Sequence, residues 1–164
     1  MAFDMFLKIG TIAGESTDEK HTEWIECLSY SHGVTQPTTV RSSAAGIASE
    51  RADHMDFTVV KTLDKASPKL NLKCSNGEQI GEVIVELARA TGDKQKYMEY
   101  VMTDVIVSSV RPEGNAQGEG TVPLEEVSFN YGKIQWTYTE TDPQTGQPKG
   151  DVKASWDLIS NSGG

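Results

Sequence analysis

Hydrophobic and polar residues alternate along most of this chain, with the two-residue period of half-buried β-strands. The pattern predicts seven strands, over residues 3–10, 24–31, 54–62, 82–90, 96–110, 124–139 and 152–158. Only the segment from Pro68 to Asn76 carries good helix signals, because Ser67 is placed as an N-cap and proline occupies the first helical position. Gly77 is placed to end this helix. We therefore expect a mainly β protein with one short helix.

The aromatic-rich stretch from Leu124 to Thr139 changes its hydrophobic parity in the middle. Its apolar residues lie at odd positions up to Tyr131 and at even positions from Ile134 onward. A β-bulge near Gly132 would keep both sets on one core and would bend the strand. A bent strand can serve two sheets or turn the corner of a barrel. The alternative is a tight turn at Tyr131–Gly132 that makes two short strands.

We predict the bent strand, and therefore a closed or nearly closed β structure. The predicted strand over 96–110 is a second candidate for a bend, because its apolar set also shifts. The turn signal Thr91-Gly92-Asp93 joins it to the preceding strand as a hairpin. Together the elements predict a β-barrel or a two-sheet sandwich flanked by one short helix. With 164 residues, we expect a single domain spanning 1–164.

A long segment without clear periodicity separates two of the predicted strands. Residues 32–53 are rich in Ser, Thr, Ala and Gly and contain Pro37. Loops of this length inside compact domains are uncommon and are usually functional or mobile. Composition alone leaves both interpretations open, a functional loop and a mobile surface loop.

Charge and composition exclude several classes of function. The net charge is −9, and an acidic chain opposes a phosphate backbone or an anionic membrane surface. We therefore expect neither nucleic-acid binding nor membrane insertion, and no window approaches 18 apolar residues. The first ten residues lack the features of a secretory signal peptide, so the chain is expected to begin in the cytoplasm. Cys27 and Cys74 have no CxxC spacing and are interpreted as free core residues, although one bridge between them stays open.

The candidate chemical groups form no recognisable catalytic or metal motif. His21, His32 and His54 show neither an i, i+4 pair nor an HExxH motif, so we expect no metal site. Glu125 and Glu126 are adjacent on a strand and therefore point to opposite faces, with one expected in solvent and one at a sheet edge. The three tryptophans could form a sugar-binding platform, but core packing is the more common use. We expect no cofactor and no enzymatic activity.

Several motifs in a fixed order give the chain a resemblance to a known family. They are DMFLKIG at 4–10, GEST at 14–17, LSYSHGV at 28–34, LDKASPKL at 63–70, VSSV at 107–110 and LEEVSFNYGKIQWTY at 124–138. With these motifs the chain resembles the Hcp (haemolysin-coregulated protein) family, which supplies the tube protein of bacterial type VI secretion systems. The agreement covers nearly the whole length and is weakest at residues 35–53 and 111–122.

The resemblance implies a fold, an assembly and a route out of the cell. It implies a β-barrel of two antiparallel sheets flanked by one short helix. It also implies a homohexameric ring that stacks into a tube inside a contractile sheath below a spike protein. The tube would leave the cytoplasm by type VI secretion without a cleaved signal peptide, and would carry or chaperone small effectors in its lumen.

The resemblance also implies roles for particular residues. The segment at about 33–53 corresponds to an extended loop that reaches a neighbouring subunit or ring, with Val40 and Ile47 as apolar anchors. Arg41 and Arg51 belong to the same implied assembly region. Ser31 corresponds to a position that faces the lumen and affects effector binding. The alternative for Ser31 is a strand serine bonded to backbone.

Two other functions remain to be distinguished from the tube protein. The first is a carbohydrate- or protein-binding β-sandwich that uses the tryptophans. The second is a hydrolase whose carboxylates, among them Glu125, come together only in space. Ring-shaped hexamers in gel filtration and microscopy would favour the tube protein, whereas a glycan-binding monomer would favour the first alternative.

Overall fold

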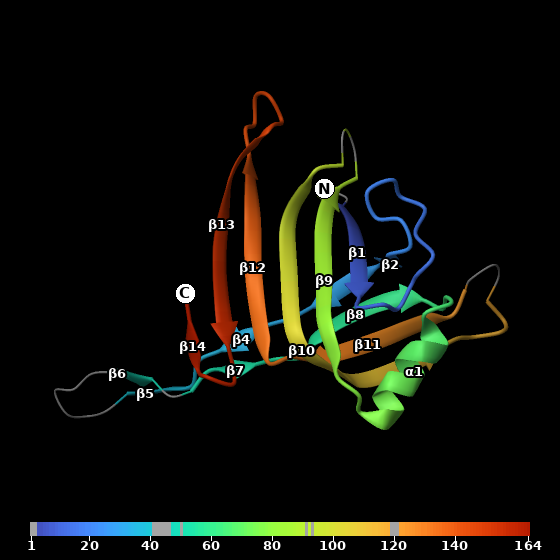
Figure 1. The fold of residues 1–164 in the computed structure, drawn as a ribbon, viewed down its shortest axis with the longest axis horizontal. Helices are drawn as coiled ribbons and strands as arrows, with labels where there is room; N and C mark the ends of the chain where they lie inside the picture. Colours follow the sequence, from blue (N-terminus) through green and yellow to red (C-terminus); the bar gives the residue numbers. More distant parts are fainter. Residues whose placement is uncertain (1–2, 41–46, 50, 91, 93, 119–121) are drawn as a thin grey trace.

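The structure is a computed structural model that describes residues 3–40, 47–49, 51–90, 92, 94–118 and 122–164, with the backbone alone at 39, 40 and 47–49 (Figure 1). Its first strands are short, and a single helix follows them. These elements are β1 (Phe3–Ile9), β2 (Ile25–Cys27), β3 (Ser29–Ser31), β4 (Val34–Thr35), β5 (Thr38–Val40), β6 (Ile47–Ser49), β7 (Asp53–His54), β8 (Phe57–Thr62) and α1 (Ser67–Asn76). Longer strands make up most of the second half. They are β9 (Ile80–Arg89), β10 (Lys96–Glu113), β11 (Leu124–Asn130), β12 (Lys133–Thr141), β13 (Pro148–Asp157) and β14 (Ser162–Gly163).

Two antiparallel sheets share the long strand β10. The first sheet runs β14-β13-β12-β10-β9-β1-β2, and the second runs β10-β11-β8-β3. Figure 1 shows the long strands of the first sheet standing across those of the second, with α1 at the outer end of the second. The prediction of a mainly β protein with two antiparallel sheets and one short helix is confirmed. The two sheets do not close into a complete barrel, because β13–β14, β2 and β3 end them without pairing to one another.

The bend predicted within residues 96–110 is confirmed in β10. This strand pairs with β12 from Met98 to Thr103 and with β11 from Ile106 to Glu113. Between the two regions, Asp104 has a φ of +54°, a left-handed value that turns the strand out of one sheet and into the other. β10 therefore forms the corner of the fold.

The central stretch also changes sheet, but as two strands. β11 pairs with β8 and the second part of β10, whereas β12 pairs with β13 and the first part of β10. The prediction of one continuous bent strand is wrong, because the pairing stops at Tyr131 and Gly132, and two strands separated there are the observed alternative. Gly132 donates its backbone N–H to the carbonyls of Thr103 and Asp104 at 3.0 and 3.2 Å, so the interruption lies against the bend in β10. The change of hydrophobic parity marks this crossing between sheets.

The predicted strand over 24–31 is likewise divided between the sheets. β2 pairs with β1 in the first sheet, and β3 pairs with β8 in the second. The connecting residue Leu28 is exposed, and its N–H donates to the carbonyl of Val60 at 2.7 Å. The two ends of this short segment face the core from different sheets. The segment therefore needs apolar residues on both of its faces.

The helix begins one residue earlier than predicted and is held by a buried ion pair. Ser67 is the first residue of α1 and not its N-cap, which is Ala66; Gly77 ends the helix with a φ of +67°, as predicted. The Ser67 hydroxyl instead donates to Oε2 of Glu125 at 2.7 Å. The same oxygen lies 2.6 Å from Nζ of Lys61, and neither charged side chain is exposed. Placing Glu125 in solvent or at a sheet edge was therefore wrong, although Glu126 does point to the opposite, exposed face.

Candidate assembly surface

The apolar face of the first sheet extends beyond the core of the protein. Antiparallel partners lie on the same face of a sheet, and so do residues two apart in one strand. The face begins on β1 and β9, where Leu7 is paired with Val85. It continues through three cross-strand rows over β10, β12 and β13. These rows are Met102–Ile134–Trp156, Tyr100–Trp136–Ala154 and Met98–Tyr138–Val152.

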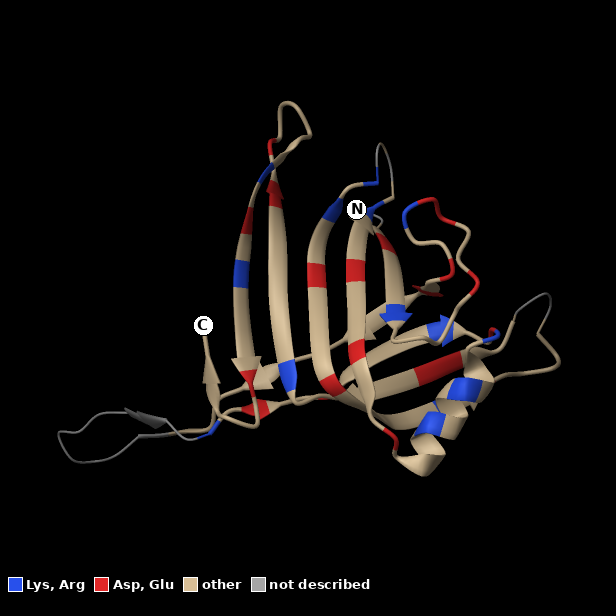
Figure 2. Ribbon diagram, in the orientation of Figure 1, with Lys and Arg blue, Asp and Glu red and all other residues tan. Residues whose placement is uncertain are grey.

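Burial decreases steadily across these rows toward β13. Met102 and Ile134 have no exposed surface, whereas Tyr138 is 50% exposed and Val152 is 68% exposed. The segment between Lys133 and Glu140 of β12 carries no charged residue, which Figure 2 shows as an uninterrupted uncoloured length of strand. Contiguous exposed apolar residues, unlike single ones, are typical of surfaces that bind a partner. We refer to the exposed part of this face, over Tyr138, Val152 and Ala154, as the assembly face.

Both ends of the first sheet have unpaired backbone in the described part of the chain. On one side β14 and Gly164 bond only to residues 155–157, so residues 148–154 of β13 have β12 as their single neighbour. On the other side β2 pairs only with β1. Free strand edges carry unsatisfied N–H and C=O groups, so they pair readily with another chain unless they are covered.

A groove of about 310 Å³ borders the assembly face where the loop over 33–53 meets the C-terminal strands. Its lining is largely aromatic and apolar, with a few polar groups. The lining residues are Val34, Gln36, Arg51, Ala52, His54, Trp136, Trp156 and Asn161. The His54 ring stacks on Trp156 with centroids 6.4 Å apart, and burial lowers the pKa of His54 below its usual value. Because the imidazole is thereby kept neutral near pH 7, the groove has an aromatic wall and one permanent cation, Arg51.

The predicted assembly residues lie in different parts of the structure. Arg51 lies beside the assembly face, and its Nη2 donates to the Leu158 carbonyl at 2.8 Å. Val40 and Ile47 are register partners in the β5–β6 ribbon, which extends away from the two sheets (Figure 1). Arg41 lies outside the described residues. Ser31 is exposed on β3, the last strand of the second sheet, where its partner is Thr58.

Glu125, the carboxylate considered for catalysis, lies in the interior of the protein. The described residues contain no cluster of three or more His, Cys, Asp or Glu side chains that could hold a metal ion. Glu125 is paired with Lys61 and completely buried, so a substrate in solution cannot reach it. Cys27 and Cys74 are free, partly buried thiols. No helix among the described residues is both long and apolar enough to cross a membrane.

Comparison with known proteins gives one consistent match. The family model for "Type VI secretion system effector, Hcp" matches residues 6–138. Protein hcp1 of Pseudomonas aeruginosa is 32% identical over 162 residues, which cover 98% of each chain. The chain belongs to the Hcp family. The resemblance read from the motifs is thus confirmed, and the chain is a type VI secretion protein of the tube and effector class.

Other Hcp relatives agree in sequence and in structure. The Major exported protein of Pseudomonas aeruginosa is 29% identical over 131 residues, 76% of this chain and 74% of that protein. A solved structure of a type six secretion system protein superposes with a TM-score of 0.93 at 32% identity, covering 99% of this chain and all of the other. Hcp1 from Salmonella typhimurium gives a TM-score of 0.81 at 30% identity and covers 99% of each chain. The Hcp fold is therefore shared along nearly the whole chain.

Sequence reasoning found the family but missed the assembly face. The available signal was the alternation of Val152, Ala154 and Trp156 with charged and polar residues near the end of the chain. That pattern predicts an apolar face, yet it does not tell whether the same chain covers it. The face is left uncovered because β13 lies at the end of the sheet, where β12 and β14 are its partners among the described residues.

Proposed function

We propose that this Hcp protein is a structural subunit that forms hexameric rings, and that the rings stack into the tube expelled by type VI secretion. The carrying observation is the assembly face, where the apolar surface of the core continues onto Tyr138 and Val152 without cover from the described chain. Burying such a surface against a second copy is favourable by about 25 cal/mol for each Å² of apolar area. Family membership supplies the context of this self-association.

Ring closure needs two different patches on every subunit. In a head-to-tail contact the assembly face of one subunit meets another surface of the next, and the ring closes when the rotation divides a full turn. The free edges at β13 and β2 lie at opposite ends of the first sheet, so they support an arrangement in which each subunit has a neighbour on both sides. An isologous dimer would use only one of these ends.

The finer roles are part of the same proposal. We infer a single Hcp domain over 1–164, with the β5–β6 ribbon reaching a neighbouring subunit or ring and Ser31 facing the lumen. The sheath, the spike and small effectors are the proposed partners. Export of the folded protein through the secretion system follows, and no enzymatic activity is proposed. The buried, ion-paired state of Glu125 argues against the hydrolase alternative.

The experiment compares assembly of the purified protein with that of charge variants. Val152→Asp places a carboxylate on the assembly face and is expected to shift gel filtration from hexamer to monomer, with rings lost from negative-stain images. Leu72→Asp is the matched control, because Leu72 is also an exposed apolar residue, at 58%, but lies on α1. Both variants should unfold at the denaturant concentration of the parent protein if the fold is intact. Rings that persist in Val152→Asp would remove the assembly face from the mechanism.

Two further variants test the roles taken from the family. Ile47→Asp in the ribbon is expected to weaken ring or tube assembly while the sheets still fold. Ser31→Arg is expected to leave rings intact but to reduce the small secreted proteins recovered with them from spent medium. A monomeric parent protein that binds glycans would instead support the carbohydrate-binding alternative, for which Trp136 and Trp156 in the groove are the available aromatic residues.

A further inference from the structure

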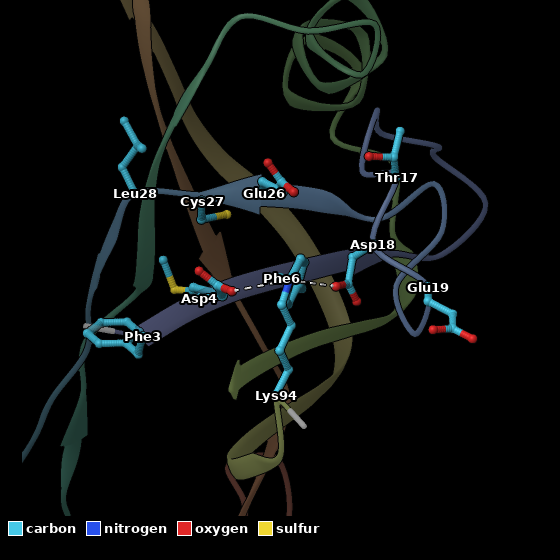
Figure 3. Close-up of a pocket in the computed structure, with 11 residues that line it drawn as sticks. Phe3, Asp4, Phe6, Thr17, Asp18, Glu19, Glu26, Cys27, Leu28 and Lys94 are labelled. Atoms are coloured by element: carbon cyan, nitrogen blue, oxygen red, sulfur yellow. Dashed lines mark hydrogen bonds and ion pairs between the residues drawn. The ribbon is translucent and has the colours of Figure 1, made fainter. Parts of the chain in front are cut away.

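The loop between β1 and β2 forms one wall of a second cleft, far along the first sheet from the assembly face. This cleft has a volume of about 800 Å³. Thr17, Asp18 and Glu19 of the loop line one side, and Phe3, Cys27 and Leu28 line the other (Figure 3). The loop is folded on itself by backbone hydrogen bonds, among them Ser16 N–H to the Trp24 carbonyl at 2.9 Å. Its attachment to the sheet therefore sets the shape of the cleft.

One buried histidine fastens this loop to the sheet. The His21 side chain is only 6% exposed, and each of its ring nitrogens faces a carboxylate. Nδ1 lies 2.7 Å from Oδ2 of Asp18 in the same loop, and Nε2 lies 2.6 Å from Oε2 of Glu86 on β9. The ring stacks on Phe6 with centroids 4.0 Å apart and meets the Trp24 ring edge-on at 4.9 Å. The imidazole thus bridges loop and sheet while aromatic rings exclude water from it.

This arrangement is satisfied by only one protonation state of the imidazole when both carboxylates are ionised. An ionised carboxylate only accepts hydrogen bonds, whereas a neutral imidazole has one donor nitrogen and one acceptor nitrogen. The imidazolium ion donates from both nitrogens and so matches both carboxylates. The hydrogen bond from His21, ahead of those from Lys94 and the Lys20 backbone, lowers the pKa of Asp18 below its usual value.

Charged groups lie around the imidazole on each strand packed against it. Lys94, between β9 and β10, lies 3.4 Å from Oδ1 of Asp18 and 4.0 Å from Oδ2 of Asp4 on β1. Lys96 of β10 lies 3.7 Å from Oε1 of Glu86 and 2.9 Å from Oε2 of Glu99. Two further charged groups lie nearby: Glu26 of β2, which is paired opposite Phe6 and lines the cleft, and Lys8 of β1, with Nζ 5.8 Å from the Trp24 ring centre. Both carboxylates that face His21 are therefore also paired with a lysine, which favours their ionised form.

We propose that His21 is an imidazolium ion that clamps the β1–β2 loop onto β9, and that this clamp makes the loop a pH-responsive wall of the cleft. As the pH rises, loss of the proton leaves one ring nitrogen with its lone pair toward a carboxylate. The contact then changes from attraction to repulsion in a site where water is excluded, and the loop detaches. At low pH the clamp is lost when Asp18 is protonated. Because the pKa of Asp18 is lowered, its carboxylate stabilises the closed loop until the pH falls through that lowered value.

The protonation state is measured directly by NMR of the imidazole nitrogens in labelled protein. At pH 7.5 His21 is expected to give the signals of an imidazolium with both nitrogens protonated. His32 and His54 are internal controls, because burial lowers their pKa values and should keep both neutral at that pH. The signals are assigned by removing His32 or His54. A neutral His21 signal at pH 7.5 would overturn the proposal.

The clamp is tested by hydrogen exchange of the loop as a function of pH. The protected amides of Gly14, Ser16 and Glu23 report on loop closure, and their intrinsic exchange rates are corrected for pH. Above the pH at which the imidazolium signals are lost in the NMR experiment, their protection factors are expected to fall by about tenfold for each unit of pH. Core amides of β9 should not follow this change.

Glu86→Gln distinguishes a proton-dependent clamp from simple packing. A glutamine amide can donate to the neutral imidazole, so the loop should stay protected as the pH rises and its pH profile should become flat. Lys96 keeps its bond to Glu99 in this variant. Equal pH profiles in the parent protein and Glu86→Gln would overturn the proposal. β2 lines the cleft and also carries one of the free edges proposed for ring closure, so both measurements are made on Val152→Asp as well as on the parent protein. A clamp that fails in both proteins is then separable from a failure of the assembly proposal.

Discussion

Lys61 and Glu125 form an ion pair in which Nζ lies 2.6 Å from Oε2 and neither side chain has exposed surface. They come from neighbouring strands, since β8 and β11 pair with Glu125 opposite Lys61. Asp64 accepts a further bond from the ammonium at 2.9 Å, and Ser67 links the carboxylate to the start of α1. The pair therefore fixes where the helix packs against the second sheet.

Removing one member of this pair should be much more destabilising than removing both. Glu125→Leu leaves the buried Lys61 ammonium with Asp64 as its one paired carboxylate among the described residues. The variant is expected to reduce the free energy of unfolding by about 3–5 kcal/mol. Lys61→Met combined with Glu125→Leu should recover most of that loss, because an apolar pair needs no charge compensation. Urea denaturation of the two single variants and the double variant measures this. A double variant as unstable as the sum of the singles would contradict it.

Gly132 should tolerate no side chain. A Cβ at this position would lie 3.0 Å from Cβ of Asp104 and 3.1 Å from Cδ1 of Ile159, at the bend of β10. Gly132→Ala is expected to cost about 1–3 kcal/mol through crowding. Gly81→Ala is the control, because a Cβ there meets no atom within 4 Å, and its unfolding midpoint should stay close to that of the parent protein. Equal denaturation curves for both variants would show that the bend in β10 accommodates the added methyl group, and would contradict this prediction.

Cys27 should be chemically inert in the folded protein. Burial raises the pKa of its thiol to about 12, so very little of the reactive thiolate is present at pH 8. In a Cys74→Ser background, labelling of Cys27 by a disulfide reagent is expected to be about a thousandfold slower in the native protein than in urea. Rapid native labelling at pH 8 would show that the cleft beside Cys27 opens easily.

Much of the secondary structure follows from local patterns in the sequence. The alternation in residues 3–10 and 82–90 identifies β1 and β9, whose residues are then buried on one face. The proline after Ser67 and the glycine at 77 mark the helix to within one residue. The loss of parity near Gly132 revealed a crossing between sheets, but not whether the strand remains continuous. Continuity depends on hydrogen bonds to β10, which lies about thirty residues away in the chain.

The candidate sites depended more on contacts distant in sequence. The His21 clamp joins residues 65 positions apart, and Lys61 meets a glutamate 64 positions further along the chain. Their local sequence shows only polar residues in a loop or charged residues on a strand. Charged groups are rarely buried unless paired, so burial of Glu125 is predictable only when its partner is known. The same reasoning applies to the assembly face, whose exposure depends on which strand ends the sheet.

The sequence by itself determined the Hcp family, the β class, the single short helix and the acidic charge, because these depend on composition, periodicity and ordered motifs. The tertiary structure decided which faces are covered, where β10 bends between two sheets, and which charged groups meet in the interior. These features arise from pairing between distant segments, whose free energy depends on the neighbours that the fold provides and not on the local residue pattern.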